Sequence, residues 1–586
     1  MVGFRAEIGA ARGALRPTSG LGAQVLEDLA GKIAEAVNGT LGPIAGFLEE
    51  YVWAWPEKAP LLAVVLLGTG LFVTLRLMFI QVRGFKHAVD ITRGKYDDPN
   101  DAGDLNHFQA LTTALSATVG IGNIAGVAIA IRMGGPGALF WMWLTAFFGM
   151  ALKYVECTLA VSMRKVHKDG SVSGGPMHYI EQGMGPKWKW MAMVFAACAA
   201  ISSFGGGCMN QSNTLALQVR EQWGIPTVWT SLVFAALVAL VIVGGIKRIG
   251  RVTSILAPTM AVLYVAGAMV ILALNAAEIP GGLALIVTQA FNPEPLVGGA
   301  VGSFMLTLMW GIRRGLFSNE SGQGSAPIAH ATAKTDEPVR EGLVASLGPF
   351  IDTLVICTMT GLVIVLTGVY KDKADQTLDL SAVEIVMSGA AKDSELIELR
   401  ESRSAGTIDV VDGRASGATF VYFDSMVENA TLTGDDDAPW SGRLVVDGDG
   451  AATVDGDPPH ISGEALMTGA PLTSMGFKAG LPGRWGSLIV TIAVILFAMS
   501  TGISWSYYGD RSVEYLFGPG AIPIYRWVFI AFFFMGGILP LKAVWTFGDV
   551  ALGLMSFPNL IALLFLTGFV VKLTKDYFSR DHQPTR

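Results

Sequence analysis

Glycines and polar residues interrupt an apolar stretch at residues 115–137 that is otherwise hydrophobic enough to cross a bilayer. Gly120, Gly122 and Asn123 stand close together in it. Lipid offers no partner for the backbone N–H and C=O groups that a break frees, so a broken helix must face a protein cavity or a polar ligand. We therefore expect a ligand here, with a carboxylate on the N–H groups of Ile121 and Gly122, where the second half-helix begins. Close helix packing through small residues is the alternative.

A second interruption is predicted within residues 304–327, where Gly311, Arg313, Arg314 and Gly315 break an apolar helix. Paired interruptions at corresponding positions of two halves indicate the binding site of a secondary transporter built from inverted repeats. The two breaks together predict a two-part site for a small polar molecule.

Further candidate substrate contacts lie in other apolar segments. Asn210 and Gln211 follow three glycines inside a predicted span, where an unpartnered polar group is costly. Hydrogen bonding between helices is the alternative for both residues. Trp310, just before the second break, is a candidate for closing the pocket and limiting side-chain size, or an ordinary packing residue.

Charged residues within predicted spans are a separate signal, because each costs about 2.5 to 3.5 kcal/mol at mid-membrane. Arg313, Arg314 and Glu320 stand at the second break, and Asp352 lies in the following span. We interpret them as gating or structural pairs, with Asp352 and Glu320 as the alternative carriers of a proton.

The elements that position these residues are membrane spans. Of 586 residues, 52% are hydrophobic and only 15% are charged, against about 25% charged in a soluble domain. The chain is therefore predicted to be a multi-pass protein of the lipid bilayer. No basic tract points to nucleic acid, and scattered histidines without metal spacing or a nucleophile partner do not favour an enzyme or a cofactor.

Apolar runs predict eleven spans, and lysines and arginines gather in alternate loops. This alternation places the N-terminus outside and the C-terminus in the cytoplasm. After the first span the other ten form two sets of five, so the second set is inverted. The predicted spans are 59–80, 107–133, 138–163, 190–220, 228–246, 252–275, 299–329, 343–369, 486–508, 524–540 and 548–573.

The predicted fold is an all-α membrane protein, a 5+5 inverted repeat with one extra N-terminal span. An acidic insert with 20 acidic and nine basic residues should lie outside as a small β-rich domain or a partly disordered loop. The expected divisions are 1–56 (amphipathic segment, with a helix between residues 24 and 48), 57–106 (extra span and cytoplasmic linker), 107–275 (first repeat), 299–370 with 485–573 (second repeat), 371–484 (insert) and 574–586 (cytoplasmic tail).

Long motifs spread over the membrane part resemble one family, the alanine or glycine:cation symporters, also called sodium:alanine symporters. The motifs are GIGNIAGVAIAIRMGGPGALFWMW at 120–143, SGGPMHYI at 173–180, RRGLFSNESGQGSAPIAHATAKT at 313–335, FIDTLVICTMTGLVI at 350–364, WSYYGDRSVEYLFG at 505–518 and MSFPNLIALL at 555–564. The resemblance implies a leucine-transporter-type fold and sodium as the coupling ion.

The resemblance also implies ion ligands. Backbone carbonyls at Ser116 and Val119 should face Ser500 and Thr501 to form one sodium site. A second site would use Asn123, the second broken helix, and Thr353 or Asp352. No other cofactor is implied.

Two departures from the family pattern stand out. The family usually has a short loop where this chain carries residues 371–468. The chain also has Ser321 and Gln323 in the run Glu-Ser-Gly-Gln-Gly, where the family commonly has alanine and leucine.

The resulting hypothesis is sodium-coupled symport of a small neutral amino acid, alanine or glycine, by alternating access in the plasma (inner) membrane of a prokaryote. A proton-coupled symporter and a transporter-like sensor that uses the acidic insert are the alternatives.

Overall fold

A computed structural model describes most of the chain. The predicted amphipathic helix between residues 24 and 48 lies almost wholly outside the described residues. These are 47–56, 61–98, 101–167, 171–293, 299–380, 383–387, 404–422, 425–434, 438–448, 450–454, 456, 458–539 and 541–582.

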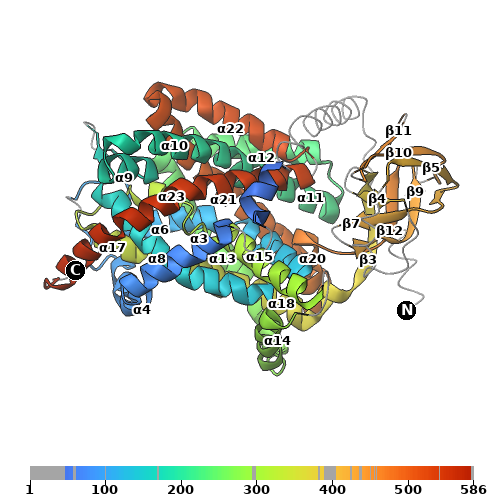
Figure 1. Ribbon diagram of the computed structural model, residues 1–586, viewed down its shortest axis with the longest axis horizontal. Coiled ribbons are helices and arrows are strands. Elements are labelled where there is room, and N and C mark those ends of the chain that lie inside the picture. Colours follow the sequence, from blue (N-terminus) through green and yellow to red (C-terminus); the bar gives the residue numbers. More distant parts are fainter. Residues whose placement is uncertain are drawn as a thin grey trace.

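Helices form a bundle, and strands gather at the end opposite the C-terminal end of α23 (Figure 1). The helices are α3 (Leu61–Arg76), α4 (Ile80–Arg83), α5 (Phe85–Thr92), α6 (His107–Thr118), α7 (Val127–Gly134), α8 (Ala138–Ser162), α9 (Pro176–Gly183), α10 (Lys189–Phe204), α11 (Asn210–Trp223), α12 (Thr227–Ile242), α13 (Gly245–Leu274), α14 (Ile279–Phe291), α15 (Gly299–Asn319), α16 (Ala326–His330), α17 (Pro338–Pro349), α18 (Thr358–Thr367), α20 (Gly469–Gly480), α21 (Trp485–Phe517), α22 (Ile522–Gly536) and α23 (Leu541–Phe578).

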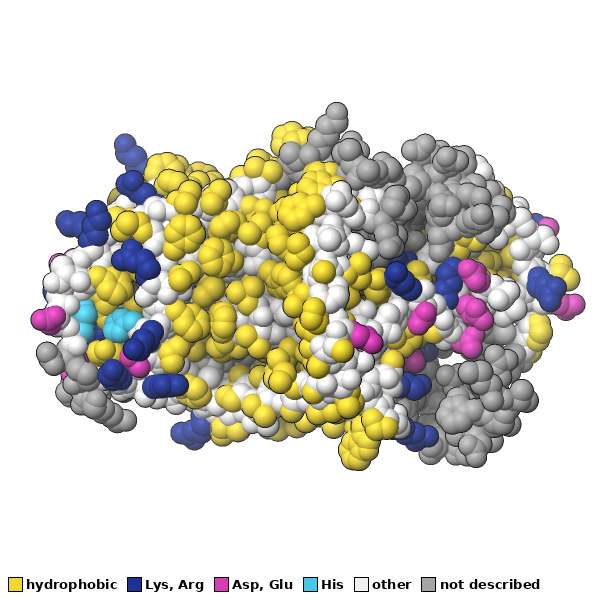
Figure 2. All heavy atoms as spheres, turned by 90° about the horizontal axis from the view of Figure 1, so that it is seen from below, with side chains coloured by type: hydrophobic (Ala, Val, Ile, Leu, Met, Phe, Trp, Pro, Cys, Tyr) yellow, Lys and Arg dark blue, Asp and Glu magenta, His cyan; other side chains and the backbone are white. Residues whose placement is uncertain are grey.

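The bundle has the exterior of a multi-pass membrane protein. Within the described residues, seven helical segments are long and apolar enough to cross a membrane, or eight if the bent pair around the first break counts as one span. Three shorter apolar helices, α3, α12 and α14, accompany them. Figure 2 shows hydrophobic side chains over the middle of the molecule, with charged side chains toward both ends. The count of eleven spans stays a prediction.

The first predicted break is present. Gln109 N donates to the side-chain oxygen of Asn106, and Asn106 N donates to the side-chain oxygen of Gln109, so a capping box begins α6. The helix ends at Thr118, and a wide π-type turn over Gly122–Gly126 leads into α7. The two half-helices meet at 52°. Backbone N–H and C=O groups at the bend lack helical hydrogen bonds and are available to other partners.

The second break lies later than predicted, so its placement at Gly311–Gly315 was wrong. Helix α15 runs unbroken to Asn319, and the chain bends where Glu320 has φ 55° and Gly322 and Gly324 both have φ 84°. The earlier glycines serve packing instead. A Cβ at Gly311 would lie 2.5 Å from the carbonyl oxygen of Ala138 on α8, so small residues let the two helices approach closely.

Between α18 and α20 the chain forms antiparallel sheets with a small apolar core of their own. The described sheets have the orders β11-β10-β5-β6, β3-β12-β9 and β4-β7-β8, and a separate β1-β2 pair follows α8. The strands are β1 (Lys165–Val166), β2 (Val172–Ser173), β3 (Lys373–Asp379), β4 (Glu384–Val386), β5 (Gly406–Val411), β6 (Arg414–Ala415), β7 (Thr419–Tyr422), β8 (Ser425–Met426), β9 (Glu428–Thr433), β10 (Gly442–Val446), β11 (Ala452–Val454) and β12 (His460–Leu466).

Candidate functional site

A narrow cavity lies inside the bundle where the two broken helices meet. Both breaks contribute to its wall, together with the turn before α11, one face of α21 and one residue of α23. The lining residues are Ala117, Thr118, Gly120, Gly122, Gly206, Gln211, Phe317, Glu320, Thr501, Trp505 and Leu552.

The N–H groups of the first break point to side-chain oxygens. Gly120 N donates to Asn123 Oδ1 at 2.9 Å, and Ile121 N donates to Gln211 Oε1 at 3.4 Å. Gln211 is held by its own bond to Gly206 O, at 3.0 Å. The contact from Ile121 is long, so a ligand carboxylate placed there would replace a weak hydrogen bond with a charge-assisted one.

Glycine is required at this point of the cavity wall. A Cβ at Gly120 would lie 2.4 Å from Thr501 Oγ1, and one at Gly122 would lie 3.2 Å from Phe317. A larger residue at Gly120 would therefore push α21 away and fill the space beside the N–H groups.

The four residues expected at the first ion site lie together. Thr501 Oγ1 is 3.2 Å from Ser116 O and 3.5 Å from Val119 O. Ser116 Oγ contacts Ser500 Oγ and donates to Ser500 O at 3.1 Å. All four residues are buried, and such a group of carbonyl and hydroxyl oxygens suits a hard monovalent cation.

The residues expected at the second site surround a buried carboxylate. Asp352 accepts from Asn123 Nδ2 at 2.6 Å, and from Ser318 Oγ and Thr353 Oγ1 at 2.7 Å each. Asn319, at the end of α15, donates to Thr353 at 3.3 Å. Asn123 presents its nitrogen here and its oxygen to the first break, so it orients Asp352 rather than supplying an oxygen to this site.

Neutral groups alone bond the Asp352 carboxylate. Within the described part of the chain it forms no ion pair with a lysine, arginine or histidine. The charge of Lys153 on α8 acts on Asp352 only at longer range, and a buried carboxylate without a directly bonded counter-charge is stabilised by a bound cation or by a proton. The geometry therefore favours a cation-binding or proton-binding role for Asp352.

Glu320 joins the second break to the cavity wall. Its Oε1 accepts from Trp505 Nε1 at 2.8 Å, and its Oε2 accepts from Ser325 Oγ at 2.5 Å. Of the two residues that depart from the family pattern, Ser321 is buried against Gly149 and Gln323 donates to Leu316 O at 2.8 Å. Neither lines the cavity.

The paired arginines of α15 form an ion cluster next to the cavity. Arg313 Nε donates to Asp549 Oδ2 at 2.9 Å, and Arg314 contacts the same carboxylate. Arg313 also pairs with Glu49. The Arg314 guanidinium lies 5.4 Å from the ring of Phe317, which lines the cavity. This arrangement can close one side of the cavity.

Two predicted contacts lie elsewhere. Trp310 packs on Arg313 and Arg314, with centroid distances of 5.2 and 5.4 Å, and does not line the cavity; Trp505 stands there instead. The amide of Asn210 is buried against Gly548 and has no hydrogen-bond partner among the described residues.

Several residues of the site were not predicted. Asp549 is a single acidic residue in the apolar run of the last span, and that signal could have identified it. Phe317, Ser318, Trp505 and Leu552 carry no signal of their own, because an aromatic, serine or leucine in an apolar helix is usual.

Comparisons with known proteins agree with this architecture. A family model described as the sodium:alanine symporter family matches residues 41–394 and 457–586. A sodium/alanine symporter, AgcS, of Methanococcus maripaludis is 38% identical over 90% of this chain and 96% of its own length. A probable sodium/glutamine symporter, GlnT, of Bacillus subtilis is 32% identical over 91% of this chain and 90% of its own. An uncharacterized transporter of Haemophilus influenzae is 37% identical over 92% of this chain and 97% of its own length.

Proposed function

Because the chain belongs to the sodium:alanine symporter family, whose members couple cations to amino-acid transport and are not enzymes, we propose that it takes up a small neutral amino acid, alanine or glycine, with sodium. The observation that carries this proposal is the cavity whose wall includes residues of both breaks and Thr501. Backbone N–H groups stand at one part of its wall and ion-binding oxygens stand directly behind it.

The substrate is proposed to bind with its carboxylate on the N–H groups of Ile121 and Gly122. Gln211, which reaches Ile121 N, then orients the carboxylate. Trp505 and Leu552 crowd the cavity wall and leave room for a small side chain. The alanine and glutamine in the relatives' names fit a neutral substrate, and the crowding favours the smaller one.

Sodium is proposed to bind between Ser116, Val119, Ser500 and Thr501. The second ion position is at Asp352, beside the first break. Since Asp352 forms no direct ion pair in the described residues, a proton at this position is the alternative coupling ion.

Alternating access is proposed to run between two closures of the bundle. The cluster of Arg313, Arg314 and Asp549 closes the side toward the strands, which we assign to the outside of a prokaryotic inner membrane. The opposite end, where α23 ends, is assigned to the cytosol by the loop charges. The insert and the N-terminus then lie outside, as the alternation predicts.

Uptake of radiolabelled alanine into proteoliposomes tests the function. An inward sodium gradient at constant pH should drive accumulation above equilibrium, and glycine should compete more strongly than glutamine. Accumulation with a proton gradient alone would establish the alternative coupling. If neither gradient drives accumulation of any neutral amino acid, the symport proposal is wrong.

A further inference from the structure

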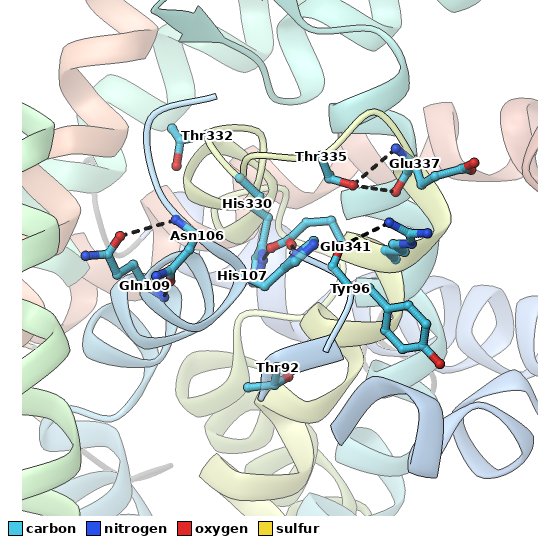
Figure 3. Close-up of polar contacts among 12 residues, drawn as sticks. Thr92, Tyr96, Asn106, His107, Gln109, His330, Thr332, Thr335, Glu337 and Glu341 are labelled. Atoms are coloured by element: carbon cyan, nitrogen blue, oxygen red, sulfur yellow. Dashed lines mark hydrogen bonds and ion pairs between the residues drawn. The ribbon is translucent and has the colours of Figure 1, made fainter. Parts of the chain in front are cut away.

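A buried cluster of ionisable side chains lies apart from the cavity, between α6, α16 and α17 (Figure 3). Glu341 stands between two histidines: His330 Nδ1 is 2.5 Å from Glu341 Oε1, and His107 Nδ1 contacts Glu341 Oε2. All three side chains are at most 1% exposed. Because a carboxylate can only accept, each Nδ1 carries a hydrogen. We call these three residues the triad.

The triad joins the two broken helices at the ends that lie away from the cavity. His107 is the first residue of α6, which leads into the first break, and His330 is the last residue of α16, which follows the second break. Glu341 belongs to the first turn of α17. One carboxylate therefore holds both half-helices to a third helix, and the half-helices cannot separate at this end unless a triad contact breaks.

Backbone contacts close the same end. Leu105 N donates to Thr332 O at 3.0 Å, and Lys334 N donates to Leu105 O at 2.7 Å. The guanidinium of Arg164 donates to Ala331 O and Ala333 O at 2.9 and 2.6 Å. These bonds do not change with protonation in the physiological range, so the triad is the titratable part of this closure.

Other ionisable groups around the triad are engaged elsewhere or are neutral. Arg164 bonds carbonyl oxygens and acts on Glu341 only through its longer-range charge. Arg340 bonds Tyr96 O and Tyr577. The ionisable side chains on the surrounding elements are Lys153, Tyr154, Glu156 and Cys157 of α8, Arg164 after α8, Asp336 and Glu337 before α17, Arg340 of α17, His87 of α5, Asp101 and Asp104 before α6, Tyr507 of α21 and Tyr577 of α23.

The charge of the triad depends on one proton. With both rings neutral, the closed triad carries a buried negative charge; one more proton makes it neutral while both N–H to carboxylate bonds remain. Burial favours the neutral arrangement. His107 Nε2 is buried with no hydrogen-bond partner in the described residues, so the added proton is better placed on His330.

We propose that the triad is a proton-binding site that latches the cytosolic closure of the transporter. It holds one more proton when closed than when open, since water entering the open form solvates the carboxylate. The sign follows from linkage: acid on this side favours the closed form, and raising the pH favours opening. This proposal rests on the proposed function for the orientation and for the motion of the half-helices.

Exchange of labelled alanine across proteoliposomes at saturating sodium, with equal pH on both sides, tests the latch. Between pH 6 and 8 the wild-type exchange rate should rise several-fold, and one proton allows at most about tenfold per pH unit. His330→Gln and Glu341→Gln should flatten this profile. His87→Gln is the matched control, because His87 bonds Tyr577 outside the triad, and it should keep the wild-type profile. A wild-type profile in His330→Gln would overturn the proposal.

A second measurement needs no transported substrate. Cys157 is fully buried on the α8 face toward Glu341, so its alkylation by N-ethylmaleimide, followed by peptide mass spectrometry, reports opening of this end. The labelling rate of wild type divided by that of His330→Gln removes the thiol's own pH dependence. The ratio should rise from pH 6 to 8, and a constant ratio would refute the latch even if the protein transports another substrate.

Discussion

Replacing Thr501 with valine should weaken sodium binding while keeping the shape of the side chain. Its Oγ1 stands between the carbonyl oxygens of Ser116 and Val119, at 3.2 and 3.5 Å, and no other side-chain oxygen reaches both in the described contacts. A polar contact to a charged group contributes about 1.5 to 3 kcal/mol. The sodium concentration for half-maximal alanine uptake should therefore rise about 10-fold to 150-fold.

The assay is initial alanine uptake in proteoliposomes over a range of external sodium. Thr501→Ser retains the hydroxyl and should keep sodium activation near wild type. Ser506→Ala is a matched control in the same helix, because the Ser506 hydroxyl only donates to Ile503 O, at 2.7 Å. Unchanged sodium activation in Thr501→Val would refute the assignment of this ion site.

Four further substitutions or deletions test other parts of the molecule. Asp352→Asn should abolish coupling to one ion, seen as a lower sodium Hill coefficient or, for a proton, as loss of accumulation driven by a proton gradient. Asp549→Asn leaves buried Arg314 without its carboxylate and should cost about 3 to 5 kcal/mol, measured as a lower melting temperature in detergent; an unchanged value would contradict the ion cluster. Trp505→Phe removes the N–H that Glu320 accepts and widens the cavity, so glutamine should compete with alanine about 10-fold better or more; unchanged competition would exclude Trp505 as the size limit. Deleting residues 374–465 should preserve alanine uptake, whereas loss of all alanine binding would favour the sensor hypothesis.

The first break could be located from the sequence because its glycines and Asn123 have no place in a lipid-facing helix. The second break was misplaced because the same interpretation was given to glycines that serve helix packing. Gly311 resembles a helix breaker in the sequence, yet it packs on α8, where close approach requires a small residue. Only three-dimensional contact distinguishes a glycine that breaks a helix from one that lets two helices approach.

The four residues expected at the first ion site lie together, whereas Trp310 and Asn210, expected at the substrate, do not line the cavity. Ser116 and Thr501 were paired through the family resemblance, and the structure brings them together. Trp310 and Trp505 are equivalent in the sequence, since each is an aromatic residue in an apolar helix. Their rotation about the helix axis decides which one meets the cavity, and the sequence does not give that rotation.

The pairing of β3 with β12 has a consequence for the insert as a whole. Lys373 and Leu466 are register partners, so the chain leaves the bundle and returns to it at points about 5 Å apart. Loop-closure cost grows slowly with length, about 0.6 kcal/mol for each doubling. The helices on either side therefore experience nearly the same restraint whether a short hairpin or an entire folded module lies between them. Another folded domain, such as a reporter, could therefore replace the insert at this junction without altering the packing of the helices that flank it.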